Sequence, residues 1–145
     1  MLTVRQLLRD RVQHTLWTIS PETTVCQALR LMAEKDIGAL PVLEGSKLVG
    51  IFTERDVARA VITRDCMNLP VRDLMTREVV TIRPEQDIEE CMTLITDECV
   101  RHLPVLEDGK LIGIVSIGDI VKTIIDLQKC TIDSLENYVT GKGYA

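Results

Sequence analysis

Hydrophobic positions follow two patterns that alternate along the chain. After Thr24, apolar side chains recur every three or four residues from Val25 to Met32, which is typical of a helix with one buried face. Two short apolar runs, 37–43 and 48–52, come next, and the polar turn between them predicts a β-hairpin. A further helical pattern follows the second run.

The whole succession occurs twice. Shifting the chain by 63 positions lays residues 37–56 on residues 100–119 without a gap. Each copy also opens with a short extended segment that a proline ends, at 18–22 and 81–85. Because a unit of this size cannot cover its own apolar face, we expect the two copies to pack on each other around one core. The predicted fold is α+β and sandwich-like, with strand, helix, strand, strand and helix in each copy.

Local signals support these elements. Thr24 and Gln27 have the spacing of a reciprocal helix cap, in which each side chain satisfies a free backbone amide. Asp108-Gly109 is a strong turn signal, because glycine adopts positive φ without steric cost. Pro41 and Pro104 cannot donate a ladder hydrogen bond, so their strand is predicted to lie at an edge or beside a bulge.

The repeat sets the predicted division of the chain. It comprises a first repeat with its lead-in (1–63), a link (64–70), a second repeat (71–127) and a terminal helix with a tail (128–145). The lead-in is Val4-Arg5-Gln6-Leu7, which resembles Val71-Arg72-Asp73-Leu74. Near-helical spacing predicts that the terminal helix covers residues 131–140, where it would pack against a partner chain or cap the core.

Composition and charge exclude several classes of protein. The 145 residues carry a net charge of -5 and only 3% aromatic side chains, so neither a basic surface nor a stacking platform for nucleic acid is expected. No apolar run approaches the roughly 20 residues needed to span a membrane, and the first residues lack the core of a signal peptide. The expected location is the cytoplasm.

The reactive residue types do not form a catalytic or metal-binding pattern. Five cysteines without a Cys-x-x-Cys pair suggest neither a disulfide framework nor a zinc site. Cys66 in the link is the best candidate for a redox-active thiol, whereas Cys26 and Cys91 lie within helical patterns. Only two histidines occur, and no nucleophile-base pair or Walker loop accompanies them, so we expect neither an enzyme nor a catalytic cofactor.

Each copy contains an apolar-proline-apolar strand and a Gly-apolar-apolar segment. They end in Gly50-Ile51-Phe52-Thr53-Glu54-Arg55-Asp56 and in Gly113-Ile114-Val115-Ser116-Ile117-Gly118-Asp119. In these features the chain resembles a tandem cystathionine-β-synthase (CBS) domain pair, the Bateman module, over nearly its whole length. It is most similar to the small stand-alone bacterial CBS-pair proteins. The resemblance implies two pseudo-symmetric repeats in one module, a homodimer formed through helices, and clefts that hold an adenine nucleotide such as AMP, ATP or NAD.

The resemblance also implies which residues bind the ligand. Asp56 and Asp119 would accept hydrogen bonds from the ribose hydroxyls, and Thr53 and Ser116, at helix starts, would favour phosphate. Backbone groups before the proline strands would read the adenine edge, beside apolar side chains such as Ile19 and Ile82. The expected ligand-binding residues are Thr18, Ile19, Ile37, Gly38, Ala39, Leu40, Thr53, Arg55, Asp56, Thr81, Ile82, Val100, Arg101, His102, Leu103, Ser116, Ile117, Gly118 and Asp119.

The two copies differ in charge where a ligand would lie. Arg101 and His102 have no charged counterpart in the first copy, whereas Arg55 has none in the second. These residues would contact phosphate or be surface residues paired with acids. We expect the cleft of Ser116 and Asp119 to bind more tightly because of the nearby charge.

Alternative interpretations remain open at this point. The Thr53-x-x-Asp56 and Ser116-x-x-Asp119 motifs also have the form of capping boxes, so they could serve only to start helices. The leading hypothesis is a non-catalytic sensor that binds an adenosyl ligand and regulates a protein partner. The alternatives are an interaction module with empty clefts, which would dimerise or dock, and a thiol-dependent redox partner.

Overall fold

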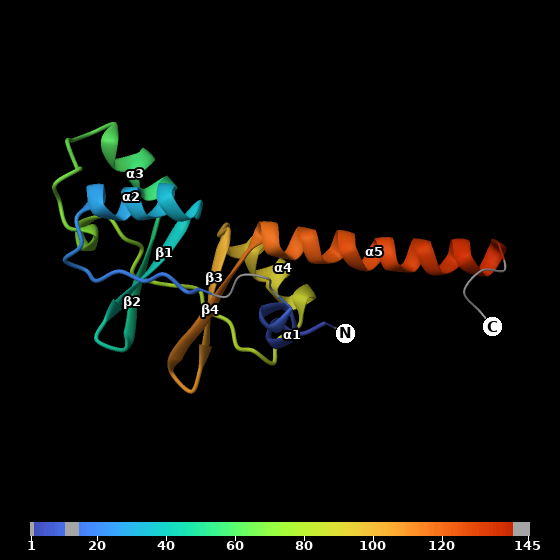
Figure 1. The fold of residues 1–145 in the computed structure, drawn as a ribbon. Helices are drawn as coiled ribbons and strands as arrows, with labels where there is room; N and C mark the ends of the chain where they lie inside the picture. The colour runs from blue at the N-terminus through green and yellow to red at the C-terminus, as the bar shows by residue number, and fades with distance from the viewer. Residues whose placement is uncertain (1, 11–14, 141–145) are drawn as a thin grey trace.

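The computed structural model describes residues 2–10 and 15–140, and it consists of two similar halves that lie side by side (Figure 1). The first half contains α2 (Val25–Lys35), β1 (Ala39–Glu44), β2 (Lys47–Thr53) and α3 (Glu54–Val61). The second half contains α4 (Ile88–Glu98), β3 (His102–Glu107), β4 (Lys110–Ser116) and α5 (Ile117–Thr140). Two short pieces precede these halves, the helix α1 (Val4–Arg9) and the 3-10 helix η1 (Val71–Asp73). The duplicated α+β architecture predicted from the sequence is confirmed.

Each half is built on an antiparallel hairpin, β1 with β2 and β3 with β4. The pairing register shifts directly after Val42 in the first hairpin and directly after Val105 in the second. Both shifts come one residue after a proline, Pro41 or Pro104, which confirms the predicted irregularity beside these residues. The missing proline N–H thus lies next to a point where the ladder is already interrupted.

The turn prediction holds, but the opening extended segments pair less than expected. Asp108 and Gly109 both have positive φ, 51° and 77°, as the turn requires. Ile19 and Ile82 each form only an isolated parallel bridge, to β1 and to β3. A proline follows each of them two residues later and ends the pairing, so no full strand forms there.

Side-chain caps begin the first helix of each half. Thr24 Oγ1 accepts a hydrogen bond from Gln27 N at 3.1 Å, and Gln27 Oε1 accepts one from Thr24 N at 3.0 Å. Asp87 Oδ1 accepts one from Glu90 N at 2.9 Å. These contacts satisfy amides that have no partner within the helix, so the predicted starts of α2 and α4 are confirmed.

The lead-in pieces are exchanged between the halves, which the sequence pattern did not indicate. Val4 and Leu7 of α1 lie in the core of the second half, where they pack in one cluster with Leu103 and Val115. Conversely, η1 belongs to the first half, because Val71 packs in the cluster formed around α2, β1 and β2. Each core is therefore completed by a segment that precedes the other half.

Backbone hydrogen bonds fix this exchange in the same way on both sides. Val4 N donates to Gln86 O at 2.8 Å, and its counterpart Val71 N donates to Thr23 O at 2.7 Å. Ile88 N at the start of α4 donates to the backbone oxygen of Leu2 at 3.1 Å. The lead-ins thus supply acceptors and donors to helix starts that would otherwise lack them.

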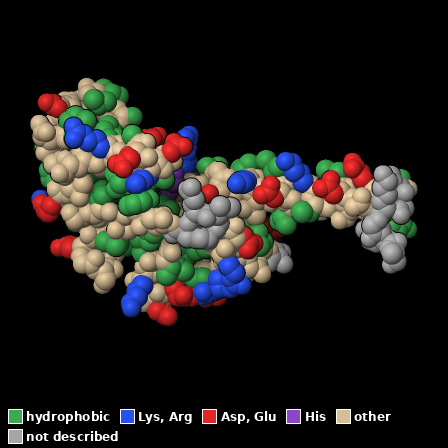
Figure 2. Space-filling model, in the orientation of Figure 1, with side chains coloured by type: hydrophobic (Ala, Val, Ile, Leu, Met, Phe, Trp, Pro, Cys, Tyr) green, Lys and Arg blue, Asp and Glu red, His purple; other side chains and the backbone are tan. Residues whose placement is uncertain are grey.

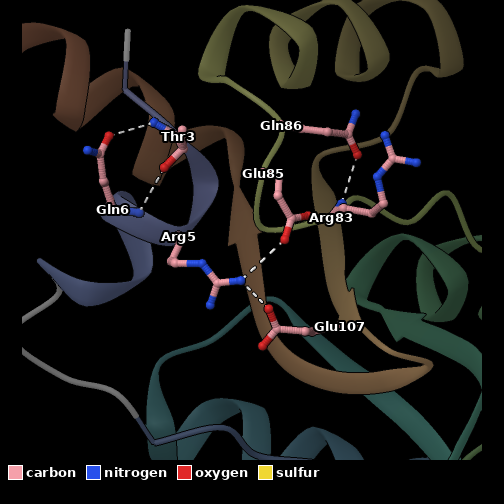
Figure 3. Close-up of polar contacts among 7 residues, drawn as sticks. All are labelled: Thr3, Arg5, Gln6, Arg83, Glu85, Gln86 and Glu107. Carbon is pink, nitrogen blue, oxygen red and sulfur yellow. Dashed lines mark hydrogen bonds and ion pairs between the residues drawn. The ribbon is translucent and has the colours of Figure 1, made fainter.

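Ion pairs repeat the exchange at the surface. Arg5 of α1 pairs with Glu85, at 3.3 Å, and with Glu107, both in the second half (Figure 3). Arg72 of η1 binds both carboxylate oxygens of Glu22 in the first half, at 2.5 and 3.2 Å. These side chains are largely exposed, so water and salt screen the pairs, and the buried contacts carry most of the docking energy.

One glycine in each hairpin makes room for the exchanged segment. A β-carbon on Gly50 would lie 2.6 Å from Met75 Sδ and 3.0 Å from the backbone oxygen of Thr76. At the equivalent Gly113, it would lie 2.9 Å from a methyl group of Leu8, which belongs to α1. The glycine of the repeated Gly-apolar-apolar segment therefore permits close approach of the lead-in from the other repeat.

The last helix differs from the prediction. The sequence favoured a helix at the end of the second repeat and a separate one over 131–140, but α5 is continuous from Ile117 to Thr140. No glycine or proline follows Gly118 within it, so nothing in the sequence ends the first helix. At 1.5 Å per residue, its 24 residues extend about 36 Å, and it projects beyond the rest of the molecule (Figure 1). Among the described residues, none of the helices is long and apolar enough to cross a membrane.

Candidate functional site

A cavity of about 350 Å³ lies between the two halves. The first half contributes the end of β2 and the start of α3. The opposite wall comes from residues 98–102 and from the connecting segment 76–80. This volume falls within the range of small-molecule sites, about 300–1,000 Å³, and a molecule bound here would touch both halves.

The carboxylate of Asp56 is the most buried polar group of the cavity. Its side chain is held at the start of α3, where the residue is 8% exposed. Thr53 donates to Asp56 Oδ2 from its backbone N, at 2.8 Å, and from its hydroxyl, at 3.2 Å, while the Thr76 hydroxyl donates to Oδ1 at 3.4 Å. An ionised carboxylate has about four acceptor positions, so Asp56 retains capacity for a ligand donor.

Charged side chains of both signs surround this carboxylate. The lining includes the bases Arg55, Arg59 and Arg101 and the acids Glu54, Glu78 and Glu98. Arg55 Nη1 also donates to the backbone oxygen of Cys99 at 3.4 Å, which joins α3 to the end of α4 across the cavity. Three guanidinium groups in one site can present flat pairs of donors to a phosphate or carboxylate.

His102 occupies the boundary between the halves. Its Nε2 would lie 3.6 Å from a β-carbon placed on Gly38, so the ring packs against the backbone of the first half. Burial lowers the pKa of His102 below its ordinary value; Asp119 and Glu54 oppose this shift, and Arg101 adds to it. The imidazole is therefore neutral at pH 7 and offers one donor and one acceptor.

This pKa shift predicts a loss of stability in mild acid. Unfolded His102 has a pKa of about 6.5, so as the pH falls below that value the unfolded state takes up the proton first. The free energy of unfolding should therefore decrease from pH 6.5 down through the lower folded pKa, with no contribution above pH 6.5. Urea unfolding at pH 7.5 and 5.5 would measure this decrease. An equal decrease in His102→Gln would contradict the assignment.

Comparison with known proteins identifies the architecture. The sequence profile of the CBS domain matches residues 4–63 and again residues 71–126. The chain belongs to the CBS-domain family. The resemblance seen in the sequence is thereby confirmed, and the two halves are a CBS pair.

Individual CBS proteins are similar over most of the chain. The mitochondrial CBS domain-containing protein CBSX3 of Arabidopsis thaliana is 38% identical over 136 residues, which cover 89% of this chain and 65% of that protein. The chain thus spans less than two thirds of that relative. A solved CBS-domain structure from Burkholderia ambifaria is 44% identical and has a TM-score of 0.81, covering 86% of this chain and 94% of that one. The crystal structure of CBSX2 in complex with AMP is 30% identical with a TM-score of 0.73, covering 88% and 99%.

The CBS pair brings only part of the expected site together in this cavity. The expected residues that line it are Gly38, Thr53, Arg55, Asp56, Val100, Arg101 and His102. Those outside its described lining are Thr18, Ile19, Ile37, Ala39, Leu40, Thr81, Ile82, Leu103, Ser116, Ile117, Gly118 and Asp119. Among these, the side chains of Leu40, Ile82 and Leu103 are at most 1% exposed and pack in the two cores. The expected apolar contact of a ligand with the Ile82 side chain is therefore corrected, because that side chain faces the core.

Arg101 and His102 lie close to both motifs. They line the cavity of Asp56. His102 also pairs with Ser116 in the register of β3 and β4, and Asp119 is one of the charges that act on its imidazole. Their charge therefore bears on both motifs, rather than on the cleft of Ser116 and Asp119 alone.

The second motif forms a reciprocal helix cap. Ser116 N donates to Asp119 Oδ2 at 2.8 Å, and Asp119 N donates to Ser116 Oγ at 3.1 Å. The next amide, of Ile117, donates to the backbone oxygen of Arg101 at 2.9 Å. The structural interpretation of the motif is thus confirmed at the start of α5, and a capping carboxylate can still accept further hydrogen bonds.

Sequence reasoning missed the connecting segment. Thr76, Glu78, Val79 and Val80 all line the cavity. They enter it because Thr76 pairs with Ile51 of β2 by two backbone hydrogen bonds, 2.9 and 3.0 Å long. Two consecutive valines before the expected site residue Thr81 were the available signal, since β-branched pairs favour extended chain.

The structure changes the assignment of the thiols. Cys66, the best candidate for a redox-active thiol, is fully buried in the core of the first half, so it does not supply the exposed thiol that this alternative requires. Burial raises the pKa of Cys91 to about 11, helped by Glu90 and Asp87, so it stays a thiol at neutral pH. Among the described cysteines, Cys99 and Cys130 are exposed.

Proposed function

We propose that this CBS pair is a non-catalytic sensor that binds an adenine nucleotide, such as AMP, ATP or NAD, in the cavity of Asp56. The observation that carries the proposal is a buried carboxylate beside three arginines in a cavity that both halves line. A ligand that contacts both halves stabilises one relative arrangement, and this differential affinity is what a sensor needs. The AMP complex of CBSX2, a protein 30% identical to this one, supports an adenosine-containing ligand.

The cavity offers a partner for each part of such a ligand. Asp56 would accept hydrogen bonds from the ribose hydroxyls, as acidic residues do in dinucleotide sites. Val79, Val80 and Val100 provide apolar contacts for the adenine ring. Arg55, Arg59 and Arg101 would pair with the phosphate oxygens.

We also propose a second, pseudo-symmetric cleft at the other motif. Ser116 and Asp119 would bind ribose and phosphate there, with Gly118 allowing close approach. The segments that face it would be those that the resemblance implies in the first repeat, Thr18-Ile19 and 37–40. Because Arg55 and Arg59 line the cavity of Asp56 in addition to Arg101, we expect weaker binding at Asp119.

Calorimetric titration of nucleotide-free protein tests the function. AMP, ATP, NAD, NADH and S-adenosylmethionine would be titrated into the native protein, Asp56→Asn and Asp119→Asn. Losing two charge-assisted hydrogen bonds costs about 3 kcal/mol, so Asp56→Asn should weaken the tighter site about 100-fold. Asparagine keeps the size and one acceptor oxygen of the cap, and Asp119→Asn is the matched control that should leave this site unchanged. Absence of heat with every ligand, from folded protein, would sink the proposal.

A second candidate function is an interaction module that dimerises or docks. Exposed apolar side chains at the end of α3 and on the first turns of α5 favour it, namely Val61, Ile62 directly after α3, Val121 and Ile125 at 58, 83, 49 and 46% exposure. They would bury apolar area in a homodimer or against a regulated protein partner. The expected cytoplasmic location stays a prediction.

A further inference from the structure

His102 connects the cavity of Asp56 with the start of α5. Its side chain lines the cavity, and as the first residue of β3 it pairs with Ser116, which ends β4 directly before α5. Its ring also packs against Gly38, which precedes β1. His102 is the one histidine among the described residues, and Figure 2 shows histidine atoms at the surface where the two halves meet. A proton on this ring would therefore add positive charge to the cavity and to the boundary between the halves.

The elements around this ring carry more acidic than basic side chains. The titratable or charged residues that line the cavity or act on the ring are Glu54, Arg55, Asp56 and Arg59 of α3, Glu78 of the connecting segment, Glu98 at the end of α4, Cys99 and Arg101 before β3, and Asp119 of α5. Five of these residues are acidic and three are arginines. A phosphate group adds about −1.5 to −2 charges at pH 7, which these arginines cannot balance in addition to the acids.

His102 is the neighbouring group that can gain positive charge near neutral pH. Burial is the main cause that lowers the pKa of His102, and Asp119 and Glu54 already oppose it. A negative charge within about 4–6 Å of an imidazole raises its pKa by about 1–3, which is enough to offset such an effect of burial. The phosphate of a ligand in the cavity would add this charge beside Arg101.

We propose that a phosphate-bearing ligand binds in this cavity together with a proton, which His102 holds. The inference rests on the proposed function and specifies how its site is regulated. Because the ring is more basic in the complex, binding takes up a proton and the affinity rises as the pH falls. The rise begins at the higher pKa of the complex and ends at the lower pKa of the free protein. Ala39 holds the equivalent place in the first repeat, opposite Thr53, and cannot titrate.

Calorimetry measures the proton directly. AMP would be titrated into the native protein at pH 7 in Pipes and in Aces, two buffers that give up a proton with different heats. We expect an uptake of about 0.5–1 proton per AMP in the native protein, and almost none in His102→Gln. Adenosine, which has the same base and ribose without phosphate, is the matched ligand and should bind without uptake.

The dissociation constant for AMP gives a second measurement. Between pH 8 and 7 it should fall about three- to sevenfold for the native protein, because His102 becomes protonated in the complex over this range. The constant for His102→Gln should stay the same. The second pKa of a phosphate group is about 6, so the charge of the ligand itself changes little between these two values of pH.

Nuclear magnetic resonance keeps the test independent of any change at position 102. The Cε1 signal of His102 in native protein labelled with ¹³C-histidine reports its pKa with and without AMP, and His14→Gln identifies which of the two histidine signals it is. We expect a higher pKa in the complex. An equal pKa in both states, or AMP binding with no proton uptake, would overturn the inference and leave the proposed function standing. Absence of heat with both AMP and adenosine, from folded protein, would overturn the proposed function and the inference with it.

Discussion

Leu7→Asp is expected to open the core of the second half while the first half stays folded. Leu7 is 5% exposed and belongs to the second half's core, so a carboxylate at this position forces α1 to detach. Detachment also exposes Val4, and burial of the two side chains contributes about 1.5–3 kcal/mol each. The free energy of unfolding should fall by about 3–6 kcal/mol. Hydrogen exchange should show faster exchange in β3 and β4 and little change in β1 and β2.

The neighbouring Arg9 provides the control for this variant. It lies on the same helix and is exposed, so Arg9→Ala should change the free energy of unfolding by less than about 0.5 kcal/mol. Equal loss of protection in both halves of Leu7→Asp would show that the halves do not unfold separately. Loss confined to the first half would contradict the exchanged docking of α1.

Gly50→Ala is expected to destabilise the protein far more than the same change at Gly113. At Gly50 the new methyl group meets the Thr76 backbone oxygen at 3.0 Å, and that backbone is held by its pairing with Ile51. At Gly113 it meets only the flexible end of Leu8. We expect a loss of about 2–3 kcal/mol at Gly50 and less than about 1 kcal/mol at Gly113, measured by urea unfolding.

Gly50→Ala should also alter the cavity around Asp56. Thr76 donates its hydroxyl to Asp56, so moving its backbone removes a contact that positions the carboxylate. Nucleotide affinity should therefore fall in Gly50→Ala and persist in Gly113→Ala. Equal unfolding energies for the two variants would show that the connecting segment moves aside easily.

The parts of the fold that the sequence predicted are those that neighbouring residues determine. The hairpins, their irregularities and the cap at Thr24 depend on residues a few positions apart. Docking of α1 could not be predicted, because Val4 and Leu7 indicate a buried face but not its partner. The two halves are copies of each other, so both offer similar apolar surfaces to a lead-in helix. Only the three-dimensional arrangement distinguishes them.

The same reason limited the prediction of the site. The Thr53–Asp56 motif and the charged residue Arg101 were recognised from the sequence, but it was not predicted that Arg101 also lines the cavity of Asp56. The sequence of one repeat does not specify which of its residues come next to the other repeat. Val79 and Val80 were missed because the exchange of lead-ins, which the sequence did not show, brings their segment to the cavity.

Exchange of the lead-ins also orders events during synthesis. The first half can close once η1 and Thr76 have left the ribosome, because Val71 completes its core. Helix α1 emerges before either half, but its docking surface includes Val115, which is made about 110 residues later. At about 5–20 residues per second, this delay is roughly 5–20 seconds, and a six-residue helix is not stable alone during that time. Helix α1 is therefore made before both halves but is among the last of these elements to fold.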